Sequence, residues 1–145
     1  MTGRLCALFL LLPVISTPLA AEEMLGQMPM ARIQIYAGPL ARDYLGCLSC
    51  DRNEVSAVLN PYGPYGWDNA YAAHSHFAQY RHPKGRYSAC DPYAAEPPIL
   101  VDSSGRTYGK LSISTLRPDS ICGPHGSPGV CVPLTEMCRH AAMDP

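Results

Sequence analysis

The chain has 145 residues, of which 47% are hydrophobic and 16% are charged, and this length suits one domain of ordinary size. Fifteen prolines and twelve glycines are more than a helix-rich fold can carry, so we expect many turns and short strands. Eleven basic and twelve acidic residues leave a formal net charge of −1, which argues against nucleic acid or an anionic membrane as the partner.

Residues 1–21 have the composition of a secretory signal peptide. One basic residue, Arg4, precedes an apolar run over residues 5–15, and small residues follow the run. The run has eleven residues, well short of the roughly 20 that a membrane-spanning helix needs. We therefore expect cleavage near Ala20 or Ala21, a mature chain without stable membrane insertion, and a periplasmic or secreted location.

The next segment, 22–31, is Met-rich and mixed in polarity, which predicts a flexible lead-in. Regular structure is expected to begin at Arg32, because residues 32–36 alternate between polar and apolar types as a half-buried strand does. Residues 42–48 are a second strand candidate. Residues 54–59 are the best short helix candidate, with Asp51 or Asn53 as its cap.

The clearest local signal lies at residues 98–113, where two β-rich runs flank Asp102-Ser-Ser-Gly105 and predict a hairpin. The sequence therefore divides into a β-rich domain at 32–116 and a Cys-rich C-terminal tail at 117–145. The tail has too little apolar content to build a core of its own. Disulfide cross-linking is the expected source of its order.

Seven cysteines are present, and Cys6 falls in the predicted signal peptide. The other six cysteines are an even number, which in an exported chain predicts disulfides, but the sequence does not choose among their pairings. Three of the six lie in the tail, and three is odd. If all six are oxidised, at least one tail cysteine must pair with the body of the domain. The six are Cys47, Cys50, Cys90, Cys122, Cys131 and Cys138.

Aromatic residues gather in a Tyr/Pro/Gly-rich stretch at 60–71. A tyrosine follows two residues after Asn60, Ala78 and Asp91, which indicates a weak repeat of one turn unit. Such rings commonly form the core of an irregular loop region. Exposed rings can instead stack on a sugar or anchor a protein surface. The candidate binding residues are Tyr62, Tyr65, Trp67 and Tyr71.

Several motifs occur together in one order along residues 44–115. They are Tyr44-Leu-Gly-Cys-Leu-Ser-Cys50, Ser56-Ala-Val-Leu-Asn-Pro-Tyr-Gly-Pro-Tyr-Gly66, Asp91-Pro-Tyr-Ala-Ala-Glu-Pro-Pro-Ile-Leu-Val-Asp102 and Gly105-Arg-Thr-Tyr-Gly-Lys-Leu111. This order resembles a group of small exported bacterial proteins with a Leu-Gly-Cys-Leu-x-Cys opening, Asn-x-Tyr-Gly-x-Tyr-Gly units and a closing Pro-Pro-x-Ile-x-Asp hairpin. The resemblance implies a bacterial, exported protein and carries no activity with it. The chain departs from the group's pattern at 74–90 and in the Cys-rich tail.

The spacing of Cys47-Leu-Ser-Cys50 is that of thiol-disulfide enzymes. A reactive thiolate usually lies at a helix N-terminus that follows a strand, and nothing nearby predicts that setting. The negative charge of Asp51 would raise the pKa of a neighbouring thiol. A structural disulfide is the favoured interpretation.

Metal binding is a second alternative. Cys47 and Cys50 with His74, His76 and His82 offer the ligand types of a zinc site. An oxidising compartment would convert the two cysteines to a disulfide and remove the thiolates that a metal needs. We therefore expect no bound metal and no other cofactor.

Catalytic motifs are weak. No Gly-x-Ser-x-Gly elbow is present, so the sequence does not predict an enzyme. The basic residues Arg81, Lys84 and Arg86 are more typical of a solvated face than of an anion site. The expected protein is a small β-rich or α+β domain with irregular Tyr/Pro/Gly-rich loops, a C-terminal β-hairpin and stabilising disulfides. Its expected function is non-catalytic binding of a protein or glycan, or association with the cell envelope.

Overall fold

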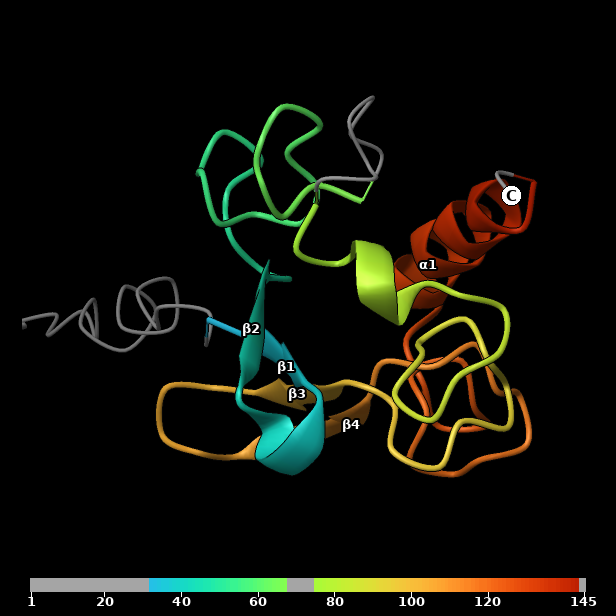
Figure 1. Ribbon diagram of the computed structural model, residues 1–145. Helices are drawn as coiled ribbons and strands as arrows, with labels where there is room; N and C mark the ends of the chain where they lie inside the picture. The colour runs from blue at the N-terminus through green and yellow to red at the C-terminus, as the bar shows by residue number, and fades with distance from the viewer. Residues whose placement is uncertain (1–31, 68–74, 144–145) are drawn as a thin grey trace, which may run out of the picture.

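In the part of the chain that the structure describes, a four-stranded antiparallel sheet and one α-helix form the framework (Figure 1). The computed structural model describes residues 32–67 and 75–143. The predicted signal peptide and the lead-in at 22–31 lie outside these residues. The strand order is β2-β1-β3-β4. The elements are β1 (Gln34–Ala37), η2 (Pro39–Ala41), β2 (Asp43–Cys47), η4 (Ala78–Tyr80), β3 (Ile99–Val101), β4 (Thr107–Lys110) and α1 (Pro128–Ala141).

The strands follow the alternation of the sequence. Ile35 and Ala37 of β1 are buried, whereas Tyr36 is only half-buried and lies between Tyr44 of β2 and Ile99 of β3. The predicted strands at 32–36 and 42–48 and the predicted hairpin at 98–113 are confirmed. The β-rich, disulfide-stabilised fold is likewise confirmed.

The ends of β2 and β4 are built in the same way. Each contains a glycine at positive φ, Gly46 at +111° and Gly109 at +101°, where a Cβ would collide with a carbonyl oxygen of a later segment. In each case the later segment forms a parallel β-bridge to the residue that follows the glycine, Ala57 with Cys47 and Ser120 with Lys110. Both outer strands of the sheet are thereby shielded over part of their length. The backbone bonds that close the two corners are Cys47 N to Ser56 O, Val58 N to Cys47 O, Lys110 N to Asp119 O and Ile121 N to Lys110 O.

Side-chain hydroxyls satisfy much of the backbone in the irregular segments. Four buried serines each accept a hydrogen bond from the backbone N–H two residues later. Such local turns satisfy the amide groups that a helix or sheet would otherwise pair. This arrangement explains how a chain rich in proline and glycine forms a packed domain. The serines are Ser75, Ser88, Ser112 and Ser120.

Three disulfides use all six cysteines of the described part of the chain: Cys47–Cys50, Cys90–Cys138 and Cys122–Cys131. Cys90–Cys138 joins the domain body to the C-terminal segment across 48 residues. The prediction that a tail cysteine pairs with the body is therefore confirmed.

The helix prediction at 54–59 is wrong. These residues form consecutive turns, because Ala57 N donates to Glu54 O and Asn60 N donates to Ala57 O. The Asp51 carboxylate accepts from Asn53 N at 2.9 Å and so starts a turn where a helix cap was expected.

The helix forms instead in the C-terminal segment, as α1, where no helix was predicted. Pro128 begins it at a position whose N–H needs no helical partner, and Pro133 lies inside it. Leu134, Met137 and Cys138 follow a helical spacing and are buried. The two prolines confine this periodic signal to the last turns of the helix, so it escapes a search for sustained periodicity.

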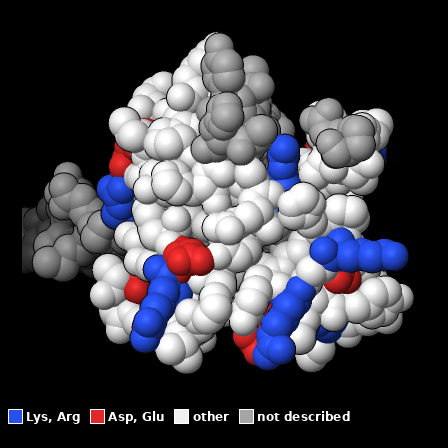
Figure 2. Space-filling model, viewed as in Figure 1, with Lys and Arg blue, Asp and Glu red and all other residues white. Residues whose placement is uncertain are grey.

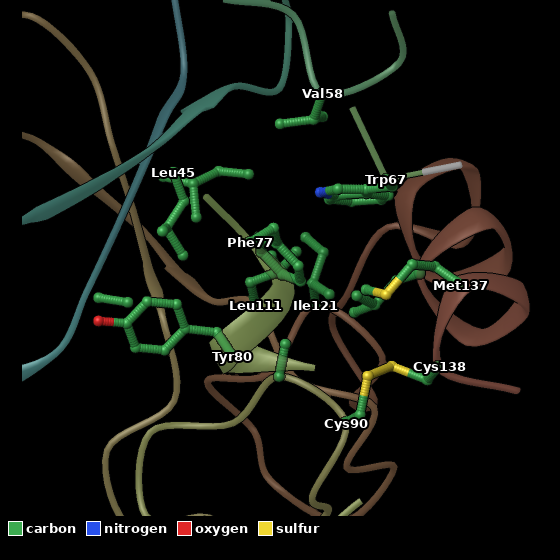
Figure 3. Close-up of a cluster of buried hydrophobic side chains, with 14 of the residues drawn as sticks. Leu45, Val58, Trp67, Phe77, Tyr80, Cys90, Leu111, Ile121, Met137 and Cys138 are labelled. Atoms are coloured by element: carbon green, nitrogen blue, oxygen red, sulfur yellow. A yellow bond between two sulfur atoms is a disulfide. The ribbon is translucent and has the colours of Figure 1, made fainter. Parts of the chain in front are cut away.

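One hydrophobic core joins the sheet, the irregular segments and α1 (Figure 3). Trp67 packs against Phe77 with ring centroids 5.7 Å apart, and Leu134 and Met137 of α1 belong to the same cluster. The C-terminal segment therefore shares the core of the domain, contrary to the expectation that cross-linking alone orders it.

Candidate functional site

The four aromatic residues singled out in the sequence do not share one environment. Tyr62 is 93% exposed, Tyr65 is half-buried, and Trp67 is only 4% exposed and belongs to the core. Tyr71 lies outside the described residues. Within the described ranges, no ring contact joins Tyr62, Tyr65 and Trp67 to one another.

The predicted turn repeat holds at two of its three positions. Asn60 and Asp91 each accept a hydrogen bond from the backbone N–H of the tyrosine two residues later, at 3.0 and 2.9 Å. Those tyrosines, Tyr62 and Tyr93, are both exposed. Tyr80 differs, because it is buried and its hydroxyl donates to Asp43.

A continuous aromatic row lies elsewhere, and we define it by Tyr36, Tyr44, Tyr65 and His76. The ring centroids are 5.4 Å apart for Tyr36 and Tyr44, and 5.2 Å apart for Tyr44 and Tyr65. His76 is stacked on Tyr65 at 4.8 Å. The three tyrosines are half-buried and His76 is exposed, so the row is partly open to solvent.

Backbone geometry holds the row together. Tyr36 and Tyr44 are partners in the register of β1 and β2. Gly46 permits the approach of Tyr65, because a Cβ at this glycine would lie 2.8 Å from the Cβ of Tyr65. His76 is fixed by a hydrogen bond from its backbone N–H to Pro64 O, at 3.1 Å.

A polar pocket of about 250 Å³ adjoins this row. Tyr44 and His76 belong to both features, so ring faces and polar groups lie together. The pocket brings a guanidinium, a carboxylate, an amide and an imidazole to one place. Its lining residues are Arg42, Asp43, Tyr44, Leu45, His76 and Gln79.

Hydrogen bonds hold some of the polar groups in and beside the pocket. The Tyr80 hydroxyl donates to the Asp43 carboxylate, and burial together with this contact keeps the pKa of Tyr80 above its usual value. Burial also raises the pKa of Tyr44. Both phenols are therefore neutral donors at physiological pH. The Tyr36 hydroxyl donates to the Gln34 side chain at 3.1 Å.

Charges are interspersed on the surface rather than segregated. Figure 2 shows basic and acidic side chains beside one another on the face drawn. Arg86 of the basic cluster noted in the sequence pairs with Glu96 and so is not an unpaired cation. Lys110 and Arg117 both contact Asp119, at 3.1 and 3.2 Å.

A second cavity, of about 350 Å³, lies between the sheet and the N-terminal end of α1. Its lining is mainly apolar and includes Ile33, Leu100, Tyr108, Ile121 and Val130. Several of its polar side chains are engaged within the protein: Asp119 pairs with Lys110, the Tyr108 hydroxyl donates to Asp102, and the Ser120 hydroxyl donates to Ser112 O. The pocket beside the aromatic row is instead lined mainly by polar side chains.

The cysteines and histidines considered for a metal site do not come together as a set of ligands among the described residues. Cys47 and Cys50 form a disulfide, which leaves no thiolate to bind a metal. His76 is stacked on Tyr65, His82 is exposed, and His74 lies outside the described residues. Residues 32–67 and 75–143 contain no group of three or more His, Cys, Asp or Glu side chains that could hold a metal ion.

Within the same ranges, no helix is both long enough and apolar enough to cross a membrane. No protein-family model matches the chain, and no curated protein or solved structure was found to be similar to it. The geometry of the aromatic row and its pocket is therefore the basis for proposing a function.

Sequence reasoning identified Tyr65 but missed Tyr36 and Tyr44. A signal for these two was present, because both occupy outward-facing positions of neighbouring predicted strands. Nothing in the sequence indicates that Tyr65 and His76 continue their row.

Proposed function

We propose that the protein is an exported, non-catalytic binding protein of the cell envelope that recognises a glycan through the aromatic row and its pocket. The observation that carries this proposal is the contact between partly exposed rings and a polar pocket at Tyr44 and His76. The C–H face of a sugar can pack on an aromatic ring. The sugar hydroxyls need hydrogen-bond donors and acceptors, and Arg42, Asp43 and Gln79 supply them in the lining of the pocket.

The disulfides support the exported location. The chain has three disulfides. Disulfides form and persist in oxidising compartments and are rare in the cytosol. The resemblance of the motif order at 44–115 to small exported bacterial proteins favours the same location.

The pocket favours binding over glycoside hydrolysis. Hydrolysis of a glycosidic bond generally uses two carboxyl groups, one on each side of the bond. Asp43 is the single carboxylate among the lining residues of the pocket, and it accepts a hydrogen bond from Tyr80.

Titration of the purified protein with chitotetraose and cellotetraose, and its co-sedimentation with isolated peptidoglycan, test the proposal. We expect at least one of these glycans to bind. Tyr65→Ala should then weaken binding about tenfold, which corresponds to about 1.4 kcal/mol for one lost ring contact. His76→Ala should weaken binding in the same direction.

Tyr62→Ala is the matched control, because Tyr62 lies in the same turn segment as Tyr65 but outside the row and is almost fully exposed. This variant should bind as the wild type does. Unfolding midpoints of all variants show whether the fold is intact. The proposal is wrong if none of the three glycans binds, or if Tyr62→Ala weakens binding as much as Tyr65→Ala.

A further inference from the structure

The two cysteines of the Cys47–Cys50 disulfide differ in their exposure to solvent. Cys47 ends β2 and is 1% exposed, whereas Cys50 lies in the following turn and is partly exposed. A guanidinium nitrogen of Arg32 lies 3.0 Å from Cys50 Sγ. A cationic group at this distance stabilises a thiolate and lowers the pKa of the thiol when the disulfide is reduced.

Arg32 is held in this position by Glu54, whose carboxylate lies 2.6 Å from the same guanidinium nitrogen. The carboxylate of the acidic neighbour Asp51 accepts a hydrogen bond from Asn53 N at 2.9 Å. Asp51 is adjacent to Cys50 in the chain, whereas Arg32 lies 18 residues away and is brought to the sulfur by the fold.

The turn that carries the two cysteines is fixed independently of the disulfide. Leu48 N donates to Ile33 O at 2.8 Å, and Ile33 N donates to Ser49 Oγ at 2.8 Å. Cys47 itself is held by backbone bonds to Ser56 and Val58. The sulfur–sulfur bond can therefore open while the surrounding backbone stays paired.

The other two disulfides differ in these respects. Cys90–Cys138 spans 48 residues, and both of its cysteines are buried in the core. Cys122–Cys131 spans nine residues and ties α1 to the preceding loop, and both of its cysteines are partly exposed, as Cys50 is, so it differs from Cys47–Cys50 in its surroundings rather than in having an accessible cysteine. Among the described residues, no arginine lies within hydrogen-bonding distance of the sulfurs of these four cysteines.

We propose that Cys47–Cys50 is a redox-active disulfide that exchanges with a dithiol while the rest of the fold remains intact. In the first step a thiolate of the dithiol attacks Cys50 Sγ, the Cys47–Cys50 bond breaks, and Cys47 leaves as a thiolate that takes up a proton. In the second step the other thiol of the dithiol loses its proton. The resulting thiolate attacks the dithiol sulfur that is bonded to Cys50 Sγ in the mixed disulfide. Cys50 is then released as a thiolate beside Arg32. Two electrons pass to the protein, and the dithiol becomes a disulfide.

Stepwise reduction of the full chain with dithiothreitol tests the proposal, with iodoacetamide trapping and peptide mapping by mass spectrometry. We expect Cys47 and Cys50 to be alkylated at dithiothreitol concentrations that leave the other four cysteines paired. The far-UV circular dichroism spectrum should stay that of the oxidised protein at this stage. In the selectively reduced protein, Cys50 should react with iodoacetamide faster than Cys47 at neutral pH.

Arg32→Gln should lower the alkylation rate of reduced Cys50 at neutral pH about threefold, because the thiolate loses its cationic partner. Arg86→Gln is the matched control. It breaks a comparably exposed Arg–Glu pair whose arginine lies over the Tyr87 ring rather than beside a disulfide. It should leave the rate unchanged.

The proposal is overturned if the three disulfides are reduced together, or if Cys122–Cys131 is reduced first. It is also overturned if Arg32→Gln reacts at the wild-type rate. Because the readout is cysteine alkylation, these outcomes do not depend on glycan binding.

Discussion

Removal of Cys90–Cys138 should destabilise the domain more than removal of any other disulfide. This disulfide closes the longest loop, with a sequence separation of 48 residues, and fixes α1 to the core. In the chain-entropy account, a loop of this length corresponds to about 4 kcal/mol at 25 °C. The separation of three residues at Cys47–Cys50 corresponds to about 2 kcal/mol on the same basis.

The double variant Cys90→Ala/Cys138→Ala measures the stability that the Cys90–Cys138 disulfide contributes. The double variant Cys47→Ala/Cys50→Ala measures the contribution of Cys47–Cys50 and is the control. Each free energy of unfolding would be obtained from urea denaturation followed by far-UV circular dichroism without reductant. Small domains have total stabilities of about 5–15 kcal/mol, so the loss of about 4 kcal/mol leaves the first variant marginally folded.

We expect the two double variants to differ by about 2 kcal/mol, with Cys90→Ala/Cys138→Ala the less stable. Equal losses, or a larger loss for Cys47→Ala/Cys50→Ala, would refute the assignment of stability to loop length. Loss of urea-unfolding cooperativity in the first variant alone would show that α1 detaches from the core as a unit.

Three further predictions concern the core, the hairpin and the tryptophan. Leu134→Ala should lower the free energy of unfolding by about 2–5 kcal/mol, because Leu134 is fully buried in the core, whereas Val132→Ala on the exposed side of α1 should change it by less than about 1 kcal/mol in urea denaturation. Hydrogen bonds, first of all from the Ser104 side chain, lower the pKa of Asp102 to about 2, so this carboxylate stabilises the hairpin above about pH 4 and loses that effect as the pH falls towards 2. Thermal unfolding of Asp102→Ala should therefore differ from the wild type at pH 6 and converge with it near pH 2, and a constant difference would contradict this assignment. The fluorescence of Trp67, the single tryptophan, should be blue-shifted and resistant to iodide quenching, and efficient quenching would show that the ring is not in the core.

Local sequence determined the elements whose signal lies within a few residues. The alternation at 32–36 and the turn residues at 102–105 predicted β1 and the β3–β4 hairpin, because strand faces and tight turns depend on neighbouring side chains. The odd number of cysteines in the tail required a bridge to the body, and Cys90–Cys138 is that bridge. The helix at 128–141 escaped prediction because Pro128 and Pro133 hide its pattern, and its stability comes from burial of Leu134 and Met137.

Tertiary structure alone decided the candidate sites. Tyr36, Tyr44, Tyr65 and His76 come from four separate segments, and the missing side chain of Gly46 lets two of those segments approach closely enough to form one row. Arg32 reaches Cys50 because Ile33, the residue before β1, is hydrogen-bonded to the turn after β2. Which rings became core and which stayed exposed was also settled by packing, as the contrast between Trp67 and Tyr62 shows. The physical reason is the same in each case: a contact between residues distant in the chain depends on how the whole backbone folds, and local side-chain preference does not encode it.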